Sequence, residues 1–532
     1  MGAFTDPRDE RDLASVLSRR VARSPDKPWL VTDDGCYTYG DIDTRSGRLA
    51  GGFARAGVAA GDTVLLMLPD TVDYICLWCA LAKLGAIEVP VNVHHRGSIL
   101  SYLINDSQAE VLVVDAQFLD RIEAVADDLD TLKRIVVVGA VDRAIDVDAE
   151  VIDWDEVSCS DRTWAGEGPS YIDLMAVMYT SGTTGPSKGA TITHAHAYQY
   201  AHGVVRMLDL NESDVYYAPL PLFHIAGQFA LVYTACIAGA TAVLPGTFSA
   251  RRFWRDVRRH NATATFLLGA MANFLYRQDP VQDDADNPLE RVLMVPLIPE
   301  TEEFKARFDC LVSTTWGGTE MNCPVRSGFD LVDNRSCGRL IEDLYEVRIV
   351  DDRDRELPPG VPGEALVRAR EPWIISNGYW NHPDWTVTAW RNQWFHTGDM
   401  LMRDDAGNYY FVDRSKDAIR RRGENISSME VENEINAHPD VLECAVIPVE
   451  SVHTEQEVMA VVVAKLGHAV DPEDLIRFLV PRMAYFMVPR YVDVVAELPK
   501  TPTGKIQKFP LRETGVTSTT WDREVAEVPL PR

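Results

Sequence analysis

The sequence predicts an α/β protein with a large N-terminal domain of layered α/β subdomains and a small, mobile α+β C-terminal domain. Its 532 residues exceed what one hydrophobic core usually organises. Short β-rich runs alternate with amphipathic stretches over the first 180 residues, a pattern typical of parallel sheets covered by helices. Near residue 413 the residue composition changes: a charged segment follows a predicted strand and precedes a predicted helix. This change indicates a domain boundary.

Five apolar runs are the predicted strands of the N-terminal domain: TVLLML (63–68), AIEVPV (86–91), AEVLVV (109–114), RIVVV (134–138) and LMAVMY (174–179). Between them, Cys76 and Cys79 form a CxxC pair inside VDYICLWCALAKLGA. The apolar periodicity and the closing Gly85 predict a buried helix there, rather than a redox or metal pair.

The sequence predicts an N-terminal domain (1–413), a hinge (414–416) that includes Lys416, and a mobile C-terminal domain (417–532). The C-terminal domain is predicted to hold strands around CAVIPV and VMAVVVA, a helix near PEDLIRFLV and a final strand at RYVDVV. This mixture predicts a small α+β unit.

Composition excludes several classes of protein. A hydrophobic content of 46% with 25% charged residues is ordinary for a folded protein. A net charge of −28 disfavours binding to nucleic acid or anionic lipid. The N-terminus has neither a basic nor an apolar leader segment, Asp6 departs from the myristoylation pattern, and no run reaches the roughly 18 apolar residues of a membrane span. Nine scattered cysteines form no framework, so a cytoplasmic protein without a stable membrane anchor is expected.

The segment YTSGTTGPSKG, Tyr179 to Gly189, carries the strongest chemical signal. Its glycines allow a close backbone approach, its hydroxyls and amides donate hydrogen bonds, and Lys188 offsets negative charge, as a polyphosphate requires. A surface turn is the alternative. The spacing is not that of a P-loop, because Ala190 follows Gly189.

YTSGTTGPSKG resembles the phosphate loop of the adenylate-forming (ANL) superfamily, which contains acyl-CoA synthetases, peptide-synthetase adenylation domains and luciferases. The resemblance continues in family order through PLFHIAG (221–227), TTWGGTE (314–320), WFHTGDM (394–400), DRSKDAIRRRGENISSMEVE (413–432) and LPKTPTGKIQK (498–508). Within the superfamily, the motifs RRRGENIS and AYFMVPRY (484–491) are most similar to those of the carnitine/crotonobetaine-type CoA ligases.

The resemblance implies an ATP-dependent acyl-CoA ligase that works in two steps. A small carboxylic acid reacts with ATP to give an acyl-adenylate and pyrophosphate, and the acyl group then passes to coenzyme A, leaving AMP. ATP, Mg²⁺ and coenzyme A are therefore the expected cofactors. Whether the chain forms a homodimer is left open.

The resemblance also implies site residues. Glu320 and Thr183 hold Mg²⁺, which prefers oxygen ligands. Lys188 and the loop bind the phosphates, and Trp316, expected to stack on adenine, adjoins further nucleotide contacts. The nucleotide-binding set is Thr180, Ser181, Gly182, Thr183, Thr184, Gly185, Trp316, Gly317, Thr319, Asp399 (ribose) and Arg414 (ribose or phosphate). The alternatives are core packing for Trp316, a turn for Asp399 and a solvated linker cation for Arg414.

Lys505, in TPTGKIQK, resembles the family lysine that bridges the carboxylate and the α-phosphate during adenylation. A fixed cation there stabilises the charge that develops when one anion attacks another. His224 matches a position that lines the acyl pocket, where it gates or orients the acid; a packed core histidine is the alternative.

The sequence departs from the family at two places. LMVPLIPETEEF (293–304) has no glycine where many relatives carry a glycine-containing adenine loop, so adenine contacts are not carried over. Arg422 precedes Gly423 where several relatives have a second glycine. A cation therefore borders the expected tunnel for the acceptor thiol.

Two kinds of alternative remain at the sequence level. The adenylate could be discharged to a carrier-protein thiol, to an amine, or as activated nitrite for arylamine diazotisation. The second alternative is a nucleotide-binding protein that has lost catalysis. The presence of Lys188, Glu320, Asp399 and Lys505 argues against it. The identity of the acid cannot be predicted from the sequence, because the shape of its pocket depends on how several side chains pack together. These include Val232, Met271, Trp316 and Met321.

Overall fold

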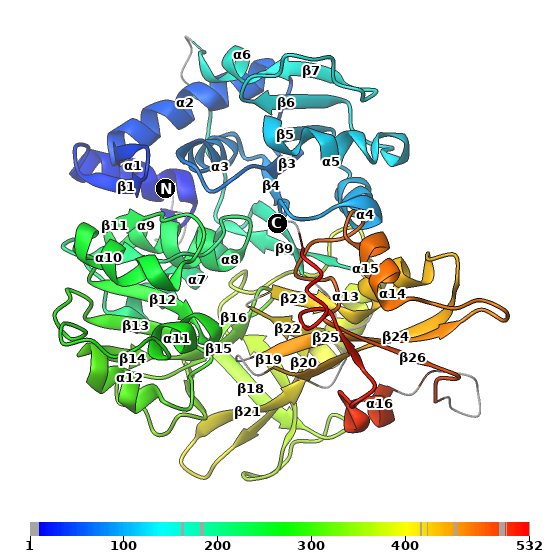
Figure 1. Cartoon of the computed structure of the whole chain (residues 1–532). Coiled ribbons are helices and arrows are strands. Elements are labelled where there is room, and N and C mark those ends of the chain that lie inside the picture. The colour runs from blue at the N-terminus through cyan, green and yellow to red at the C-terminus, as the bar shows by residue number, and fades with distance from the viewer. Residues whose placement is uncertain are drawn as a thin grey trace.

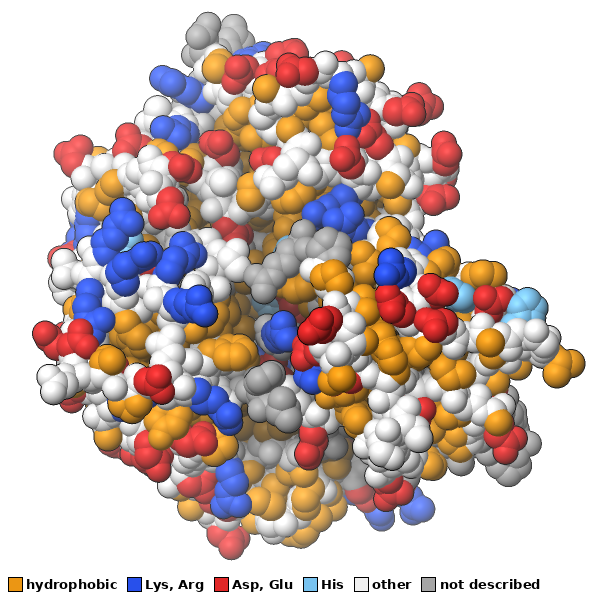
Figure 2. All heavy atoms as spheres, in the orientation of Figure 1, with side chains coloured by type: hydrophobic (Ala, Val, Ile, Leu, Met, Phe, Trp, Pro, Cys, Tyr) orange, Lys and Arg blue, Asp and Glu red, His pale blue; other side chains and the backbone are white. Residues whose placement is uncertain are grey.

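The computed structural model describes residues 10–160, 164–180, 186–414, 418–422, 424–451, 455–499, 506 and 508–530. It confirms the predicted fold class, with a large N-terminal domain of several sheets and a separate C-terminal domain (Figure 1). Over these residues, no helix combines the length and the apolar character needed to cross a bilayer. On the face drawn in Figure 2, acidic and basic side chains are interspersed.

The first sheet contains all five strands predicted from apolar runs. Its order is β7-β6-β5-β3-β4-β8-β9, parallel except for β9. The strands are β3 (Thr63–Met67), β4 (Ile87–Pro90), β5 (Val111–Asp115), β6 (Arg134–Val138), β7 (Glu150–Asp153), β8 (Leu174–Thr180) and β9 (Lys188–Thr193). The accompanying helices are α1 (Leu13–Arg23), α2 (Tyr39–Arg55), α3 (Val72–Leu84), α4 (Gly97–Ser107), α5 (Leu119–Glu123) and α6 (Trp154–Ser158).

Both faces of this sheet are covered, which explains why its strands read as continuous apolar runs. In β3, Val64 and Leu66 face one hydrophobic core, whereas Leu65 and Met67 face another. Helix α3 carries Cys76 and Cys79, each about 1% exposed, and ends at Gly85 in the left-handed conformation. The prediction of a buried helix around the CxxC pair is confirmed.

The second sheet has the order β14-β13-β12-β10-β11-β1-β2, and only β2 is antiparallel to its neighbour. Its strands are β1 (Pro28–Thr32), β2 (Gly35–Thr38), β10 (Val215–Tyr217), β11 (Thr241–Val243), β12 (Ala264–Leu268), β13 (Arg291–Val295) and β14 (Leu311–Ser313). The helices of this region are α7 (His194–Leu208), α8 (Ile225–Gly227), α9 (Thr234–Ala238), α10 (Ala250–His260), α11 (Gly269–Tyr276) and α12 (Thr301–Phe308).

An antiparallel sheet completes the N-terminal domain, drawn from green to yellow in Figure 1. Its order is β15-β16-β17-β21-β20-β19-β18. The strands are β15 (Thr315–Gly318), β16 (Asn322–Arg326), β17 (Ser336–Leu340), β18 (Tyr345–Val350), β19 (Gly363–Ala369), β20 (Phe395–Arg403) and β21 (Asn408–Arg414), with α13 (Pro383–Ala389) between β19 and β20.

The C-terminal domain, orange to red in Figure 1, contains a two-stranded hairpin and a four-stranded sheet. The hairpin is β22 (Ala418–Arg421) and β23 (Glu424–Ser427). The sheet is β24 (Val441–Glu450), β25 (Gln456–Ala464), β26 (Tyr491–Val495) and β27 (Trp521–Asp522), and the helices are α14 (Ser428–Asn436), α15 (Pro472–Leu479) and α16 (Lys508–Thr514). The strands and the helix predicted from CAVIPV, VMAVVVA, RYVDVV and PEDLIRFLV are all present.

Candidate active site

A cavity of about 580 Å³ lies where all three sheets of the N-terminal domain meet the β22–β23 hairpin. Thr180 and Lys188 reach it from the first sheet, Phe266 from the second, and Asp399 from the antiparallel sheet. Arg422 reaches it from the C-terminal domain. Residues far apart in the sequence therefore converge on one space.

One end of the cavity is apolar. It is lined from α7, β12, α11 and β13 by Tyr200, Val204, Met207, Phe266, Leu268, Met271, Leu293 and Val295. Met271 and Met321, which the sequence assigns to pocket shape, do line the cavity. Val232 is fully buried and is not part of the lining. The lining at this end suits an uncharged group.

Glu320 lies in the turn between β15 and β16, at the polar part of the cavity. This turn requires Gly317, because a Cβ there would meet the carbonyl oxygen of Asn322 at 2.1 Å. Glu320 Oε1 accepts hydrogen bonds from the hydroxyls of Thr180 at 3.2 Å and Tyr379 at 3.1 Å. Two hydroxyls thus orient one carboxylate oxygen, and a cavity-lining carboxylate of this kind fits the hard cation that the resemblance implies.

Lys188 lies opposite Thr180 across the antiparallel pair β8–β9, at the two ends of the predicted phosphate loop. Its Nζ is 5.2 Å from the Tyr379 ring centroid and 5.5 Å from that of Trp385. These aromatic faces attract the ammonium and direct it along the cavity wall. The loop residues Ser181, Gly182, Thr183, Thr184 and Gly185 lie outside the described residues.

Asp399 is on β20, 7% exposed, and lines the cavity. Its Oδ2 accepts a hydrogen bond from the indole N–H of Trp316 at 2.9 Å. Trp316 is itself 5% exposed, packs in the core of the antiparallel sheet, and is not part of the cavity lining. This position favours the core-packing alternative for Trp316, with the indole orienting the aspartate. Gly317 and Thr319 line the cavity beside it.

His224 precedes the short helix α8 and lines the cavity. Its Nδ1 accepts a hydrogen bond from the backbone N–H of Ala226 at 3.5 Å. Burial, and then the charge of Arg420, lower the pKa of His224 to about 4. The imidazole is therefore neutral at pH 7.

The C-terminal domain contributes Arg420, Arg422 and Glu424 to the cavity, all from the β22–β23 hairpin. Arg422 has a left-handed backbone with φ of 53° at the turn. Lys505, Lys416, Gly423 and the side chain of Arg414 lie outside the part of the chain that the structure describes, so their roles stay predictions.

The sequence analysis missed a contact between the two domains. Glu430, in the first turn of α14, accepts hydrogen bonds at Oε1 from the backbone N–H and the hydroxyl of Ser187, at 2.8 and 2.5 Å. Ser187 is in the phosphate-loop motif, next to Lys188. The motif SSMEVE therefore joins the phosphate-binding segment to the C-terminal domain.

Tyr379 and Trp385 were missed as well. Both lie in the segment GYWNHPDW (378–385), whose last three residues begin α13. Both line the cavity. Burial, and then the charge of Glu320, raise the pKa of Tyr379 well above its ordinary value, so its hydroxyl stays a donor. Clustered aromatic residues beside a glycine were the only available signal for this segment.

The fold has three sheets and a separate smaller domain, and its cavity combines an apolar end with the charged residues Lys188, Glu320 and Asp399. These are features of an enzyme with a nucleotide site beside an apolar pocket. The family described as "AMP-binding enzyme" matches residues 17–380, and "AMP-binding enzyme C-terminal domain" matches residues 430–505. The chain belongs to this family, which is the adenylate-forming superfamily indicated by the motifs.

Proteins similar to this chain differ in the acid that they are named for and in the bond that they form. A crotonobetaine/carnitine–CoA ligase of Escherichia coli O17:K52:H18 (strain UMN026 / ExPEC) is 33% identical over 507 residues, covering 93% of this chain and 96% of that protein. The anthranilate CoA ligase AuaEII in complex with anthranoyl-AMP has a TM-score of 0.72 and 25% identity, covering 97% and 99% of the two chains. The amide bond synthetase McbA of Marinactinospora thermotolerans has a TM-score of 0.80 and 25% identity, covering 94% and 99%.

Proposed function

We propose that this enzyme activates a small carboxylic acid with ATP, releases pyrophosphate, and transfers the acyl group to coenzyme A, giving acyl-CoA and AMP. The observation that carries the proposal is the single cavity in which an apolar end, Lys188, Glu320 and Asp399 meet the C-terminal hairpin. Glu320 would hold Mg²⁺, which supplies charge neutralisation on the triphosphate. Lys188 binds phosphate, and Asp399 accepts from ribose hydroxyls.

The acid that we propose has an uncharged, compact body, either short and aliphatic or a single aryl ring. The apolar end contains Tyr200, Phe266 and aliphatic side chains, and none of its described lining residues is charged. The nucleotide must share the same cavity of about 580 Å³, so little room is left for a long chain.

Coenzyme A is supported by a second cavity, of about 230 Å³, between the two domains. Arg96 and Arg121 line it from the N-terminal domain, and Tyr485 lines it from the C-terminal domain. Burial, and then the charge of Arg96, lower the pKa of Arg121 to about 10, and Arg121 Nη1 is buried without a hydrogen-bond partner among the described residues. Adjacent cations of this kind fit phosphate groups such as those of coenzyme A.

A pyrophosphate-release screen tests the first step. Acids from acetate to aryl and fatty acids, carnitine and nitrite are supplied with ATP and Mg²⁺, with and without coenzyme A. We expect release with a compact, uncharged acid and thioester formation when coenzyme A is added. Release with nitrite alone would replace the proposed acid, and release without thioester in the presence of coenzyme A would replace the proposed acceptor. No release with any acid would favour a protein that has lost catalysis.

A second measurement tests the acceptor site. Arg121→Gln is expected to raise the KM for coenzyme A while leaving the KM for ATP unchanged. Pantetheine, which lacks the nucleotide phosphates, is the matched acceptor, and its KM should not respond to the substitution. Equal effects on both acceptors would show that Arg121 does not bind the phosphates.

A further inference from the structure

The β22–β23 hairpin brings a guanidinium group and a carboxyl group to the active-site cavity. Arg422 is in its turn and Glu424 begins its second strand, and both line the cavity. Burial raises the pKa of Glu424 to about 7. A carboxylate with this affinity for protons is suited to accept one near neutral pH.

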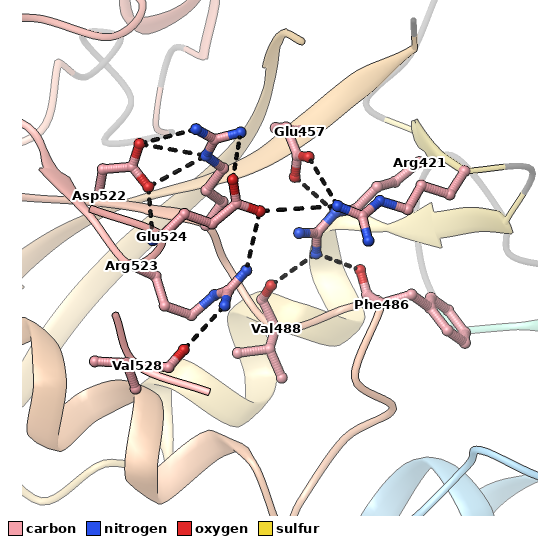
Figure 3. A network of polar contacts seen from close by, with 10 residues as sticks. Arg421, Glu457, Phe486, Val488, Asp522, Arg523, Glu524 and Val528 are labelled. Carbon is pink, nitrogen blue, oxygen red and sulfur yellow. Dashed lines mark hydrogen bonds and ion pairs between the residues drawn. The ribbon is translucent and has the colours of Figure 1, made fainter. Parts of the chain in front are cut away.

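Arg422 belongs to a network of charged residues behind the hairpin. The central pair is Arg421 and Glu457, which are 2% exposed and joined at 2.6 Å between Nε and Oε2 (Figure 3). Arg421 Nη1 also donates to the carbonyl oxygens of Phe486 and Val488, at 2.8 and 2.9 Å. These bonds fix the hairpin on the body of the C-terminal domain.

The chain's final segment supplies the other side of the network. Arg490 contacts Asp522 and Glu524, each at 3.0 Å, and Arg523 Nη1 donates to the carbonyl oxygen of Val528 at 3.1 Å. β27 pairs with β26 and holds this segment in place. The segment lies beyond the C-terminal family match, which ends at residue 505.

Arg422 is the least completely paired member of this network. Its Nη2 is 3.9 Å from Glu457 Oε1 and 3.8 Å from Glu524 Oε1, and its side chain is 48% exposed. Among the described residues, four guanidinium groups, on residues 421, 422, 490 and 523, face three carboxylates, on residues 457, 522 and 524. The network thus has an excess of positive charge. Arg422 is the member of the network that lines the cavity.

We propose that Glu424 and Arg422 activate the acceptor thiol in the second half-reaction, and that Glu457 and Glu524 position Arg422 for this role. Glu424 removes the proton from the thiol, and Arg422 stabilises the resulting thiolate. The thiolate attacks the carbonyl carbon of the acyl-adenylate, a carbon–sulfur bond forms, the bond from that carbon to the phosphate oxygen breaks, and AMP leaves with the electron pair. The inference rests on the proposed transfer to a thiol.

The remaining charged groups around the hairpin are compatible with this assignment. Glu455, directly before β25, faces Arg420 at 3.3 Å, and Glu457 is already paired with Arg421. Arg523 contacts Glu524 at 3.6 Å, and His224 across the cavity is neutral. Glu424 is therefore the lining carboxylate of the hairpin without an ion pair among the described residues.

The pH dependence of discharge tests the chemical role. Supplied acyl-adenylate is mixed with coenzyme A and the thioester is measured from pH 6 to about pH 10. We expect Glu424→Gln to lower the rate at pH 7 by about 10²-fold, the lower range for general-base catalysis. The rate should recover near pH 9.5, where the thiol, with a pKa of about 8.5 for an ordinary cysteine, ionises unaided. Arg422→Ala should move the same profile toward alkaline pH.

A double-mutant cycle tests the positioning role. Glu524→Gln should lower the discharge rate at pH 7 by about tenfold in the native background, and have no further effect when Arg422→Ala is already present. Glu524→Asp should restore part of the rate. Asp522→Asn is the matched control, because Asp522 contacts Arg490 but not Arg422. Pyrophosphate release from ATP and the acid should be unchanged in the Glu524 variants.

Each outcome decides the inference. If the native enzyme forms no thioester, the proposed function fails and the inference falls with it. If thioester forms but Glu424→Gln and Arg422→Ala keep the native pH profile, the inference alone is overturned. An alkaline shift in His224→Asn rather than in Glu424→Gln would assign the base to His224. Additive effects of Glu524→Gln and Arg422→Ala would show that Glu524 acts on the fold, not through Arg422.

Discussion

Single side chains at the active site are oriented by neighbours that approach from other sheets. Glu320 receives hydroxyl groups from Thr180 of the first sheet and from Tyr379, and Asp399 receives the indole of Trp316. Each carboxylate thus has one oxygen whose direction is fixed by a neutral donor. A neutral donor orients a carboxylate without cancelling its charge, which leaves that charge for a cation or a hydroxyl of the nucleotide.

Replacement of Glu320 tests this arrangement. Glu320→Gln is expected to lower acid-dependent pyrophosphate release by about 10²–10³-fold, since loss of one positioned catalytic group usually has an effect of this size. Tyr379→Phe, which removes one orienting hydroxyl and keeps the ring near Lys188, should have a smaller effect. The rates are measured at saturating ATP, with circular dichroism to establish that the variants are folded. Near-native turnover of Glu320→Gln would show that the assigned role is wrong.

A buried carboxylate that does not line the cavity should make stability depend on pH. Glu88 on β4 is fully buried, accepts a hydrogen bond from Gln228 Nε2 at 2.8 Å, and has a pKa that burial raises from 4.5 to about 8. Between these values the folded protein keeps a proton that the unfolded chain has released. The free energy of unfolding therefore falls as the pH rises from about 4.5 to about 8.

Glu88→Gln removes the titrating group and keeps a side chain of the same shape. Relative to the native protein, the variant should be more stable at pH 9 than at pH 5. Thermal midpoints of both proteins are compared at pH 5, 7 and 9, so that the charge changes that they share cancel. A difference between the two proteins that is independent of pH would contradict the raised pKa.

At the scale of elements, the positions of strands could be predicted from the sequence, whereas contacts between distant side chains could not. The runs 63–68 and 109–114 became β3 and β5 because parallel strands covered on both faces must be apolar throughout. The orientation of Trp316 on β15 could not be predicted, since an aromatic side chain on a strand can pack in a core or against a ligand. Nor could the pairing of Ser187 with Glu430, because it joins segments that lie 243 residues apart.

The pairing of Ser187 with Glu430 should favour the second half-reaction. It holds α14, and with it the β22–β23 hairpin, in the orientation that places Arg422 and Glu424 at the cavity. Glu430→Ala is expected to slow discharge of supplied adenylate by about tenfold, since a hydrogen bond to a charged group contributes about 1.5–3 kcal/mol. Pyrophosphate release should change little.

Glu432 provides the control for this substitution. It lies on the same helix but contacts Lys508, within the C-terminal domain, at 2.7 Å. Glu432→Gln should therefore affect both half-reactions alike, through the stability of that domain. The same uniform loss in Glu430→Ala would contradict a specific role in orienting the domain.

At the scale of the whole molecule, one orientation of the C-terminal domain presents only one set of its residues. The cavity here receives residues 420, 422 and 424 of the hairpin, while Lys508 is bonded to Ser428 and Glu432 of its own domain. We propose that rotation around the hinge at Lys416 brings Lys505 to the nucleotide for the first step. Alternation of this kind builds two sites from one set of parts.

Lys505→Ala tests that division of labour. Without this cation, acid-dependent pyrophosphate release should almost vanish, because the charge that develops as the carboxylate attacks phosphorus is no longer stabilised. The defect should appear in kcat rather than in the apparent affinity for ATP, since the interaction belongs mainly to the transition state. The same preparation should still convert supplied acyl-adenylate to product, because we propose that the hairpin serves the second step. Equal loss in both assays, in a folded variant, would show that the two steps do not use opposite faces of the domain.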